Sequence, residues 1–324
     1  MTSVSEWRIP KSAQPNPKDY GFDLEAALSA VVALRSIIPP DAFTADILGT
    51  ERAGYGALIR KDGLVLTIGY LITEAETIWV NLSDGRVLPG HSLGFDSETG
   101  FGLVQILERV NLPVLPLGDS HACELGSRVI VAGAGGRERS VAARIMAKQE
   151  FAGYWEYVLD EAIFTAPAHP HWGGTAVIGP SGDLIGIGSL QLEGAKAKGS
   201  QFLNMIVPTD LLKPILGDML KLGRPDRPVR PWLGLYAAEV EDKVVIIGLA
   251  TEGPAALAEM QTGDIIVSVG ETRVDDLGSM FRAIWAFGPA GVTVPLTIWR
   301  EGRTLEIHVK SADRNAFLKR PRAH

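Results

Sequence analysis

Residues 54–72 read GYGALIRKDGLVLTIGYLI, and this stretch decides the fold class. Two short apolar runs flank Lys61-Asp62-Gly63, and an Asp-Gly pair between such runs is a strong signal for a β-hairpin. The same arrangement returns in TIWVNLSDGRVLPG (77–90), around Asp84-Gly85. We therefore expect antiparallel strands, and not helices, in this part of the chain.

Strand-length apolar runs between Gly-rich turns continue to residue 208. They include GLVQIL (102–107), RVIVAGAGG (128–136), YVLDEAIFTA (157–166), GTAVIGPSGDLIGIGSLQL (174–192) and FLNMIVP (202–208). Helical spacing is confined to two segments. One is residues 26–38, ended by Pro39-Pro40, and the other is residues 209–223, ended by Gly223. Short strands at this spacing predict a mainly β fold, an antiparallel barrel or sandwich.

A charged, Pro-rich stretch, RPDRPVRP (224–231), marks the best domain boundary. About 80 residues follow it, which is enough for a domain that folds alone. In this second part we expect strands separated by a short helix at 255–260 and a longer helix at 276–287. The expected strands are WLGLYAAEV (232–240), KVVIIGLA (243–250), DIIVSVG (264–270) and VTVPLTIWR (292–300).

Composition narrows the function classes. The formal net charge is −7 over 324 residues, which argues against a broad nucleic-acid surface, despite a basic C-terminal end. Cys123 is the single cysteine, so we expect no intramolecular disulfide and no zinc site of paired cysteines. It is interpreted as a small core residue. No cofactor is expected.

The N-terminal residues indicate a cytoplasmic protein. Residues 1–25 mix acidic and basic side chains, whereas a secretory signal starts with a short basic stretch before its apolar core. The apolar run 26–38 contains Arg35 and is shorter than the roughly 20 residues that span a bilayer. We expect no membrane span.

Several of these segments together resemble one family. GYGALIRKDGLVLTIGYLI (54–72), GFDSETGFGLVQI (94–106) and HPHWGGTAVIGPSGDLIGIGSL (169–190) are similar, in order and spacing, to the catalytic-site segments of the HtrA/Deg-type, trypsin-like serine proteases. RPWLGL (230–235) and GPAALAEMQTGDIIVSVGE (253–271) resemble the C-terminal PDZ domain of that family. The resemblance implies a chymotrypsin-like double β-barrel followed by an α+β PDZ domain.

The resemblance also divides the chain. It implies an N-terminal segment with a helix (1–46), a degenerate trypsin-like protease domain (47–223), a linker (224–230), a PDZ domain (231–312) and a basic tail (313–324). Family members are often trimers assembled through N-terminal segments. A homo-oligomer, a trimer by resemblance, is therefore one expectation.

The positions that match the family's catalytic triad do not hold its chemistry. Tyr70 stands at the histidine position, Gly100 at the aspartate position and Trp172 at the serine position. Tyrosine is a poor base at neutral pH, glycine has no side chain, and tryptophan has no nucleophilic atom. Pro170 stands where the family supplies an oxyanion-hole N–H, and proline has none. The catalytic set is predicted to be empty.

Other residues could supply chemistry, and each has a plainer interpretation. Ser181 lies in a β-turn, where serines usually face solvent. His169 and His171 have an i, i+2 spacing that suits two metal ligands on a strand, but a surface loop is favoured and no metal is predicted. The aromatic stretch 151–164 could line a peptide groove, although filling the mouth of an unused active site is favoured.

The second domain carries the expected binding site. By resemblance, Trp232, Leu233, Gly234 and Leu235 form the loop that binds a peptide's terminal carboxylate through backbone N–H groups. The leading hypothesis is a pseudoprotease that binds protein C-termini or extended peptides as a non-catalytic scaffold. The alternatives are an active serine endopeptidase with an unrecognised site, and a chaperone-like holdase. Asp96 corresponds to a turn residue and not to the triad acid.

Overall fold

The computed structural model describes residues 7–194 and 201–319. Its residues fall into two compact units. Among the described residues, the first unit comprises residues 7–149, 161–194, 201–226 and 319, and the second comprises residues 150–160 and 227–318. Residues 150–160 therefore pack with the C-terminal unit, although they lie far from it in the sequence.

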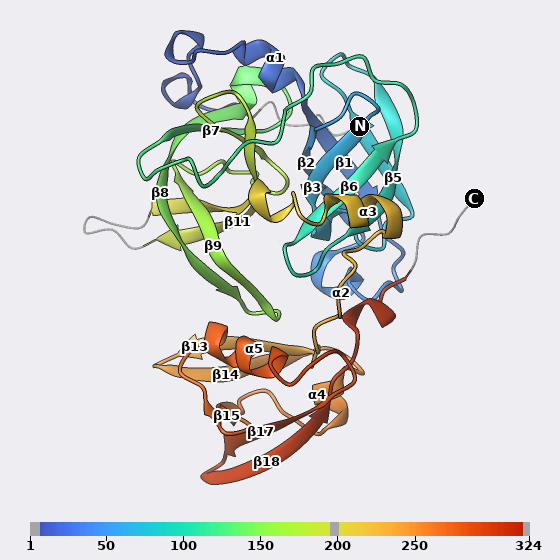
Figure 1. Cartoon of the computed structure of the whole chain (residues 1–324), viewed down its shortest axis with the longest axis vertical. Helices are drawn as coiled ribbons and strands as arrows, with labels where there is room; N and C mark the ends of the chain where they lie inside the picture. Colours follow the sequence, from blue (N-terminus) through green and yellow to red (C-terminus); the bar gives the residue numbers. More distant parts are fainter. Residues whose placement is uncertain (1–6, 195–200, 320–324) are drawn as a thin grey trace. The chain divides into compact units, whose positions relative to one another are not determined.

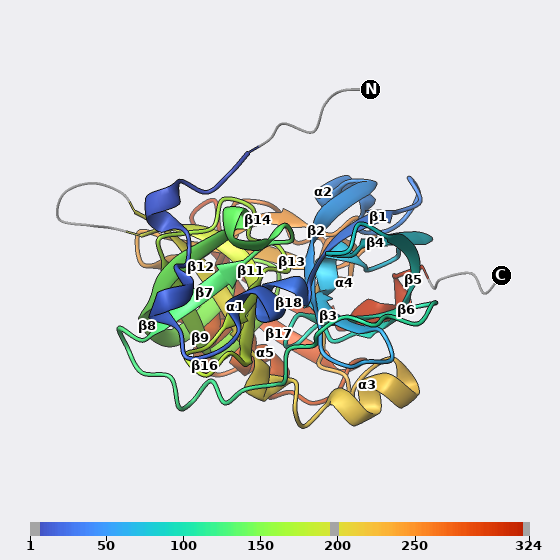
Figure 2. The ribbon, with the colours of Figure 1, turned by 90° about the horizontal axis from the view of Figure 1, so that it is seen from above.

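The first unit contains two closed antiparallel barrels, which lie side by side in two perpendicular views (Figures 1 and 2). The first barrel has the strand order β1-β2-β3-β6-β5-β4. Its strands are β1 (Val31–Ile37), β2 (Glu51–Leu58), β3 (Leu64–Ile68), β4 (Thr77–Asn81), β5 (Val87–Phe95) and β6 (Phe101–Ile106).

The second barrel has the order β10-β11-β12-β9-β8-β7. Its strands are β7 (Arg128–Ala132), β8 (Ser140–Gly153), β9 (Tyr157–Ala166), β10 (Ala176–Ile178), β11 (Leu184–Gly194) and β12 (Gln201–Pro208). Cys123 packs in its core beside Val129, Val131 and Ile185, as the sequence predicted. The mainly β double barrel expected from the sequence is confirmed.

The helix expected over residues 26–38 is wrong for most of its length. A helix, α1 (Leu24–Ser29), covers only its beginning, and Asp23 caps it through its side chain. Residues 31–37 form β1, which closes the first barrel between β2 and β4. The β-branched residues Val31, Val32 and Ile37 fit a pleated strand better than a helix, and barrel closure adds pairing on both sides. The barrel thus begins before residue 47.

Short helices lie between and after the strands of the first unit. α2 (Ala45–Leu48) and the 3-10 turns at Gly69–Leu71 and Gly136–Arg139 connect strands, and a 3-10 turn at Thr209–Leu211 and α3 (Leu216–Leu222) follow β12. Gly223 ends α3 with φ 72°. A left-handed residue at this position closes a helix, and glycine adopts it without a steric cost. The helical spacing at 209–223 is therefore confirmed in its second half.

The second unit has a sheet with the order β13-β14-β15-β17-β18, and β16 pairs with β15. Its elements are β13 (Leu235–Val240), β14 (Lys243–Leu249), α4 (Pro254–Leu257), β15 (Ile265–Val269), β16 (Thr272–Arg273), α5 (Leu277–Trp285), β17 (Thr293–Arg300) and β18 (Arg303–Lys310). Asp276 starts α5 with a capping box, and α5 buries Met280, Phe281 and Ile284 against the sheet. The strands and the longer helix agree with the sequence-based expectation.

Candidate functional site

The structure brings the three triad-like positions together in the first unit. Tyr70 lies in the 3-10 turn after β3, Gly100 directly precedes β6, and Trp172 lies in the loop between β9 and β10. The Gly69 N–H donates to the Gly100 carbonyl at 2.7 Å. A Cβ atom added to Gly173 would lie 2.7 Å from the Tyr70 hydroxyl. Three segments that lie far apart in the sequence therefore meet at one place.

The Tyr70 hydroxyl makes a structural hydrogen bond. It donates to the Ser189 carbonyl on β11 at 2.9 Å. Burial raises the pKa of Tyr70 well above its ordinary value of 10.0, and a hydrogen bond with the Trp172 side chain only partly offsets this rise. A phenol that ionises less readily than free tyrosine stays protonated near neutral pH. Tyr70 therefore cannot accept a proton from a nucleophile there.

The loop that carries Trp172 is anchored by backbone contacts on both sides. The Gly173 carbonyl accepts from Tyr55 N–H on β2 at 2.9 Å, and Gly174 N–H donates to the Gly188 carbonyl on β11 at 2.8 Å. Gly174 has φ 76°, and a Cβ atom there would lie 1.9 Å from the Tyr55 carbonyl oxygen. Only glycine fits this close approach. The loop is rigidly placed, with the partly buried Trp172 beside Tyr70.

His169 lies in the same loop, and the expectation of a surface position is wrong for it. The residue is fully buried, because the loop folds back onto β12. There Asn204 accepts from His169 N–H at 2.6 Å and donates to the His169 carbonyl at 3.2 Å. The imidazole packs edge-on against Trp7 and Tyr55.

Both ring nitrogens of His169 are occupied. Nε2 lies 2.8 Å from the Arg139 carbonyl, which can only accept, so this nitrogen carries the proton. Nδ1 accepts from His171 N–H at 3.1 Å. Burial, outweighing these hydrogen bonds, lowers the pKa of His169 to about 4. The His171 ring packs at a tilt against Trp7, with a centroid distance of 4.4 Å. No metal-binding group of three His, Cys, Asp or Glu residues occurs among the described residues.

No alternative nucleophile stands beside a base in the described part of the chain. Ser181 is exposed in a turn, as the sequence predicted. Within residues 7–194 and 201–319, no serine or cysteine side chain hydrogen-bonds to an imidazole. The Cys123 thiol faces the Asp119 carbonyl at 3.8 Å, and burial raises its pKa, which keeps it protonated and unreactive. Asp96 binds Thr99 N–H and hydroxyl in a turn.

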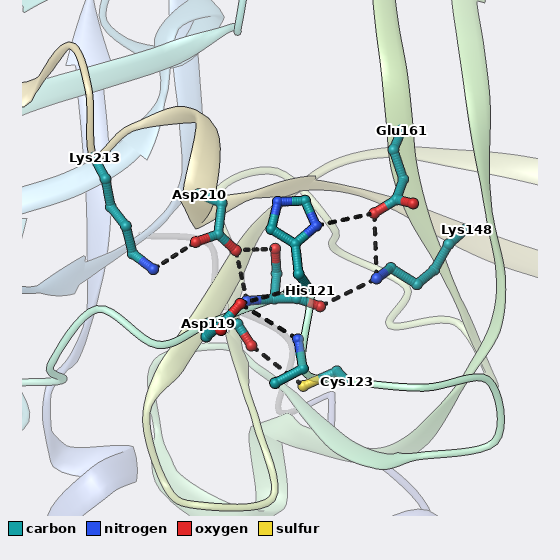
Figure 3. Close-up of polar contacts among 9 residues, drawn as sticks. Asp119, His121, Cys123, Lys148, Glu161, Asp210 and Lys213 are labelled. Carbon is teal, nitrogen blue, oxygen red and sulfur yellow. Dashed lines mark hydrogen bonds and ion pairs between the residues drawn. The ribbon is translucent and has the colours of Figure 1, made fainter.

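A second polar cluster, drawn in Figure 3, holds the connection between the barrels in place. Asp210 accepts from the Ser120 N–H at 2.6 Å and also from the Ser120 hydroxyl. Lys148 donates to the Ser120 carbonyl at 3.2 Å and pairs with Glu161 at 3.2 Å. Burial opposes ionisation of Asp210, but hydrogen bonds from Lys213 and Ser120 lower its pKa to about 2. The polar groups of this cluster pair with one another, which is typical of a cluster that stabilises the fold. We call the cluster the clamp.

The loop of the second unit that the sequence assigned to carboxylate binding presents its backbone N–H groups to one place. The N–H groups of Leu233, Gly234 and Leu235 all donate to the side-chain carboxylate of Glu156, at 3.1, 2.6 and 3.0 Å. Gly234 has φ 76°, which turns successive N–H groups toward a single acceptor. The loop can therefore bind a carboxylate.

Trp232 contributes differently from the other three loop residues. It is buried, and its backbone exchanges hydrogen bonds with Ala312 at 3.0 and 2.9 Å. Its ring packs against Phe317 at a centroid distance of 4.9 Å. Trp232 thus anchors the start of the loop.

Most of the aromatic stretch expected at an unused active site packs with the second unit, whereas Phe164 stays on β9 in the first. Phe151, Tyr154, Trp155 and Tyr157 form ring contacts with one another, and the segment that carries them belongs to the second unit. Tyr154 packs against Tyr236 of β13 at 6.1 Å. The expectation was wrong because it placed these residues by family resemblance alone, whereas the long β8–β9 hairpin carries them to the second unit.

Sequence reasoning missed Glu156. The only signal in the sequence is an acidic residue inside an aromatic run, YWEY (154–157). Its role depends on contacts with Leu233 and Leu235, which lie 77 and 79 positions along the chain, and no local pattern reveals them.

Comparison with known proteins agrees with this geometry. A family model described as a trypsin-like peptidase domain matches residues 54–187, and a PDZ domain model matches residues 231–311. The chain is of the HtrA type. The serine endoprotease DegS of Haemophilus influenzae is 26% identical to this HtrA-type chain, over 82% of the chain and 78% of DegS.

Other relatives are longer than the chain. A probable periplasmic serine endoprotease, DegP-like, of Halomonas elongata is 26% identical over 80% of this HtrA-type chain but only 56% of its own length. The chain thus spans about half of that relative. The solved structure of the HtrA-type protease AlgW with tripeptide is 23% identical, with a TM-score of 0.53 over 92% of the chain and 97% of AlgW, which shows a common fold. Among the described residues, no helix is long and apolar enough to cross a membrane.

Proposed function

We propose that this HtrA-type protein is a pseudoprotease, a non-catalytic scaffold that binds the C-termini of partner proteins through its PDZ domain. The absence of catalysis in this proposal is supported by one observation: Tyr70, Gly100 and Trp172 meet at one place. A serine hydrolase needs a nucleophile, a base, an orienting acid and oxyanion donors. Tyr70 keeps its proton, Gly100 has no side chain, Trp172 has no nucleophilic atom, and Pro170 has no N–H.

The loop of residues 232–235 supports the peptide-binding part of the proposal. A PDZ domain binds a peptide's terminal carboxylate through backbone N–H groups and adds the peptide as a strand to a sheet edge. Leu233, Gly234 and Leu235 offer three such donors, where the chain enters the edge strand β13. The related AlgW structure is described with a tripeptide, which fits a peptide ligand of this kind.

The catalytic half is tested with a fluorophosphonate probe for reactive serines and with unfolded casein as a general substrate. We expect neither labelling nor cleavage by the full chain. The second candidate function, an active serine endopeptidase with an unrecognised site, is favoured by the names of the relatives. Labelling that persists in a Trp172→Ala variant would establish that candidate and reject the pseudoprotease.

The binding half is tested with a pool of biotinylated decapeptides, randomised at the last four positions. One pool has free C-terminal carboxylates, and its twin is amidated. We expect capture of the free-carboxylate pool only, and loss of capture in Gly234→Glu. A Cβ at Gly234 would lie 3.2 Å from Ala250 Cβ, and the new carboxylate would repel the ligand's. Equal capture of both pools would instead indicate holdase-like binding of extended chains.

Three further expectations stay predictions. A trimer is checked by light scattering of the full chain. The cytoplasmic location expected from the sequence is checked by cell fractionation, and it contrasts with the periplasmic names of several relatives. The absence of a cofactor is checked by mass spectrometry of the native protein.

A further inference from the structure

We propose that the tip of the β8–β9 hairpin, residues 150–160, is a built-in ligand of the peptide site, with the Glu156 carboxylate in the place of a partner's terminal carboxylate. A partner C-terminus must then displace this tip before it can bind. The inference rests on the proposed peptide-binding function and adds its regulation. Within the second unit, four separate contacts support it.

The first contact is the carboxylate itself. Glu156 accepts three backbone hydrogen bonds, from Leu233, Gly234 and Leu235, with distances of 2.6 to 3.1 Å. Leu233 N–H lies 3.1 Å from each of the two carboxylate oxygens. These are the donors that a peptide's terminal carboxylate would need. While Glu156 is in place, these three N–H groups are not available to a second carboxylate.

The second contact imitates strand addition. Ala237 N–H, on β13, donates to the Tyr154 carbonyl at 3.0 Å. β13 is an edge strand of the sheet, hydrogen-bonded to β14 on its other side. A bound peptide would pair with the same open edge through a residue two positions before its C-terminal residue. Tyr154 thus lies two residues from Glu156, at the spacing that a peptide backbone would have.

The third contact is apolar. Val158 is buried, with 7% exposure, in the core cluster of the second unit, which also contains Leu235, Leu277 and Phe281. Ala152 packs against the same cluster. The tip therefore supplies both a carboxylate and an apolar side chain. A peptide ligand of a PDZ domain brings the same two groups.

The fourth contact is electrostatic and involves α5. Arg282 of α5 pairs with Glu150 at 2.7 Å and with Asp160 at 2.6 Å. One residue comes from each strand of the hairpin, so the guanidinium holds both strands of the tip. Contacts alternate along the tip: residues 150, 152, 154, 156, 158 and 160 all contact the C-terminal part of the second unit, residues 227–318.

Two features indicate that the tip can be displaced. Glu156 has φ 61°, a left-handed conformation that costs energy for a residue with a side chain. Burial raises the pKa of Glu156 to about 7, against the opposing effect of the Leu235, Leu233 and Gly234 hydrogen bonds and of Arg314. The docked carboxylate thus gives up much of its hydration. A free peptide terminus that meets the same donors competes with a strained occupant.

The first experiment measures amide hydrogen exchange in the full chain for the wild type, Glu156→Ala and Glu252→Ala. Glu252 is a matched control, because it is an exposed glutamate of the second unit with φ 57°. We expect the amides of residues 233–235 to exchange at least 10-fold faster in Glu156→Ala and at the wild-type rate in Glu252→Ala. Unchanged exchange in Glu156→Ala would overturn the inference.

The second experiment measures binding of the free-carboxylate decapeptide pool to the same proteins. We expect Glu156→Ala to bind about 10-fold more tightly than the wild type. Arg282→Glu, which repels Glu150 and Asp160 and leaves the loop intact, should also bind more tightly. It keeps the inference testable if Glu156→Ala does not fold. Equal affinity in all variants would overturn the inference and leave the proposed function standing.

The two proposals fail in different ways. If neither the wild type nor the variants bind the pool, the peptide-binding function is rejected. In that case faster exchange in Glu156→Ala still supports occupation of the loop by the tip. If the amidated pool competes as well as the free one, the carboxylate is not recognised and the role assigned to Glu156 is overturned.

Discussion

At the scale of single residues, the loop 169–174 determines what the first unit can do. Its backbone is held by Tyr55, Gly188 and Asn204, so its position does not depend on a catalytic side chain. By the resemblance to trypsin-like proteases, Trp172 and Pro170 stand at two places in this loop where a hydrolase of that type would need an Oγ and an N–H. The backbone contacts of this loop maintain the fold, whereas catalysis would depend on other atoms of the loop. A change at those atoms can therefore remove activity without changing the fold.

Restoring a hydroxyl should not restore activity. In Trp172→Ser, the neighbouring side chain at the base position is Tyr70, whose raised pKa keeps it protonated. Removal of the indole also removes the hydrogen bond that offsets the effect of burial. We expect labelling by a fluorophosphonate probe no higher than that of the wild type. The matched control is Ser181→Ala, an exposed turn residue, which should give the same background. Strong labelling of Trp172→Ser would mean that a base was overlooked.

His169 makes the stability of the first unit depend on pH. Its ordinary pKa is 6.5, and burial lowers it to about 4. Between these values the unfolded chain binds a proton that the folded chain does not. The stabilisation is therefore present above pH 6.5 and is lost as the pH falls toward 4. A shift of this size corresponds to about 3 kcal/mol.

The measurement is denaturant unfolding of the wild type and of His169→Gln between about pH 7.5 and pH 4. The wild type should lose about 3 kcal/mol more than the variant over this range. The variant is expected to be less stable at neutral pH, because it leaves the buried Arg139 carbonyl or His171 N–H poorly paired. Parallel pH profiles for the two proteins would show that His169 is not the titrating group.

At the scale of elements, local turn chemistry made most strands predictable. The Asp-Gly pairs at Asp62 and Asp84 lie between β2 and β3 and between β4 and β5, as hairpin signals require. Residues 31–37 were not predictable from spacing, because Leu28, Val31 and Val32 suit one face of a helix as well as a strand. Pairing with β2 and β4, which the local sequence does not encode, decided the outcome.

The clamp in Figure 3 is an element-scale device, because it ties the connection between the barrels to β8, β9 and the 3-10 turn at Thr209–Leu211. In Asp210→Ala the buried Ser120 would lose the acceptor for both its N–H and its hydroxyl. We expect a loss of about 1–3 kcal/mol in the free energy of unfolding. Asp218→Ala, which removes a carboxylate that binds the exposed Asp226 N–H, is the control and should change stability by less than about 0.5 kcal/mol.

At the scale of the whole molecule, the order of the two domains along the chain could be predicted. The packing of residues 150–160 with the second unit could not. Motifs such as RPWLGL and GDIIVSVG identify the second domain from local residues. The hairpin tip contains no comparable motif. Its place in the second unit depends on Glu156, Val158 and Asp160 meeting residues far along the chain. The peptide loop could therefore be predicted from sequence, but its occupant could not.

Removal of the residues after 226 should expose this tip. A chain that ends at residue 226 would leave Val158 and Tyr154 without the surface they pack against. Apolar surface without a partner favours association. We expect the truncated chain to bind the dye ANS more strongly and to aggregate sooner than the full chain. Replacement of residues 150–160 by a short Asn-Gly turn should reverse both effects, and failure of this rescue would locate the exposed surface elsewhere.

The Ala237 hydrogen bond to Tyr154 also protects β13 from other strands. An edge strand with unpaired backbone groups can pair with the same strand of another molecule. With the tip in place, part of the edge over residues 235–240 is covered. When the tip leaves and no peptide replaces it, two such edges can pair in a dimer. Occupancy of this edge would thus control whether the protein is found singly or in pairs, with concentration deciding between them.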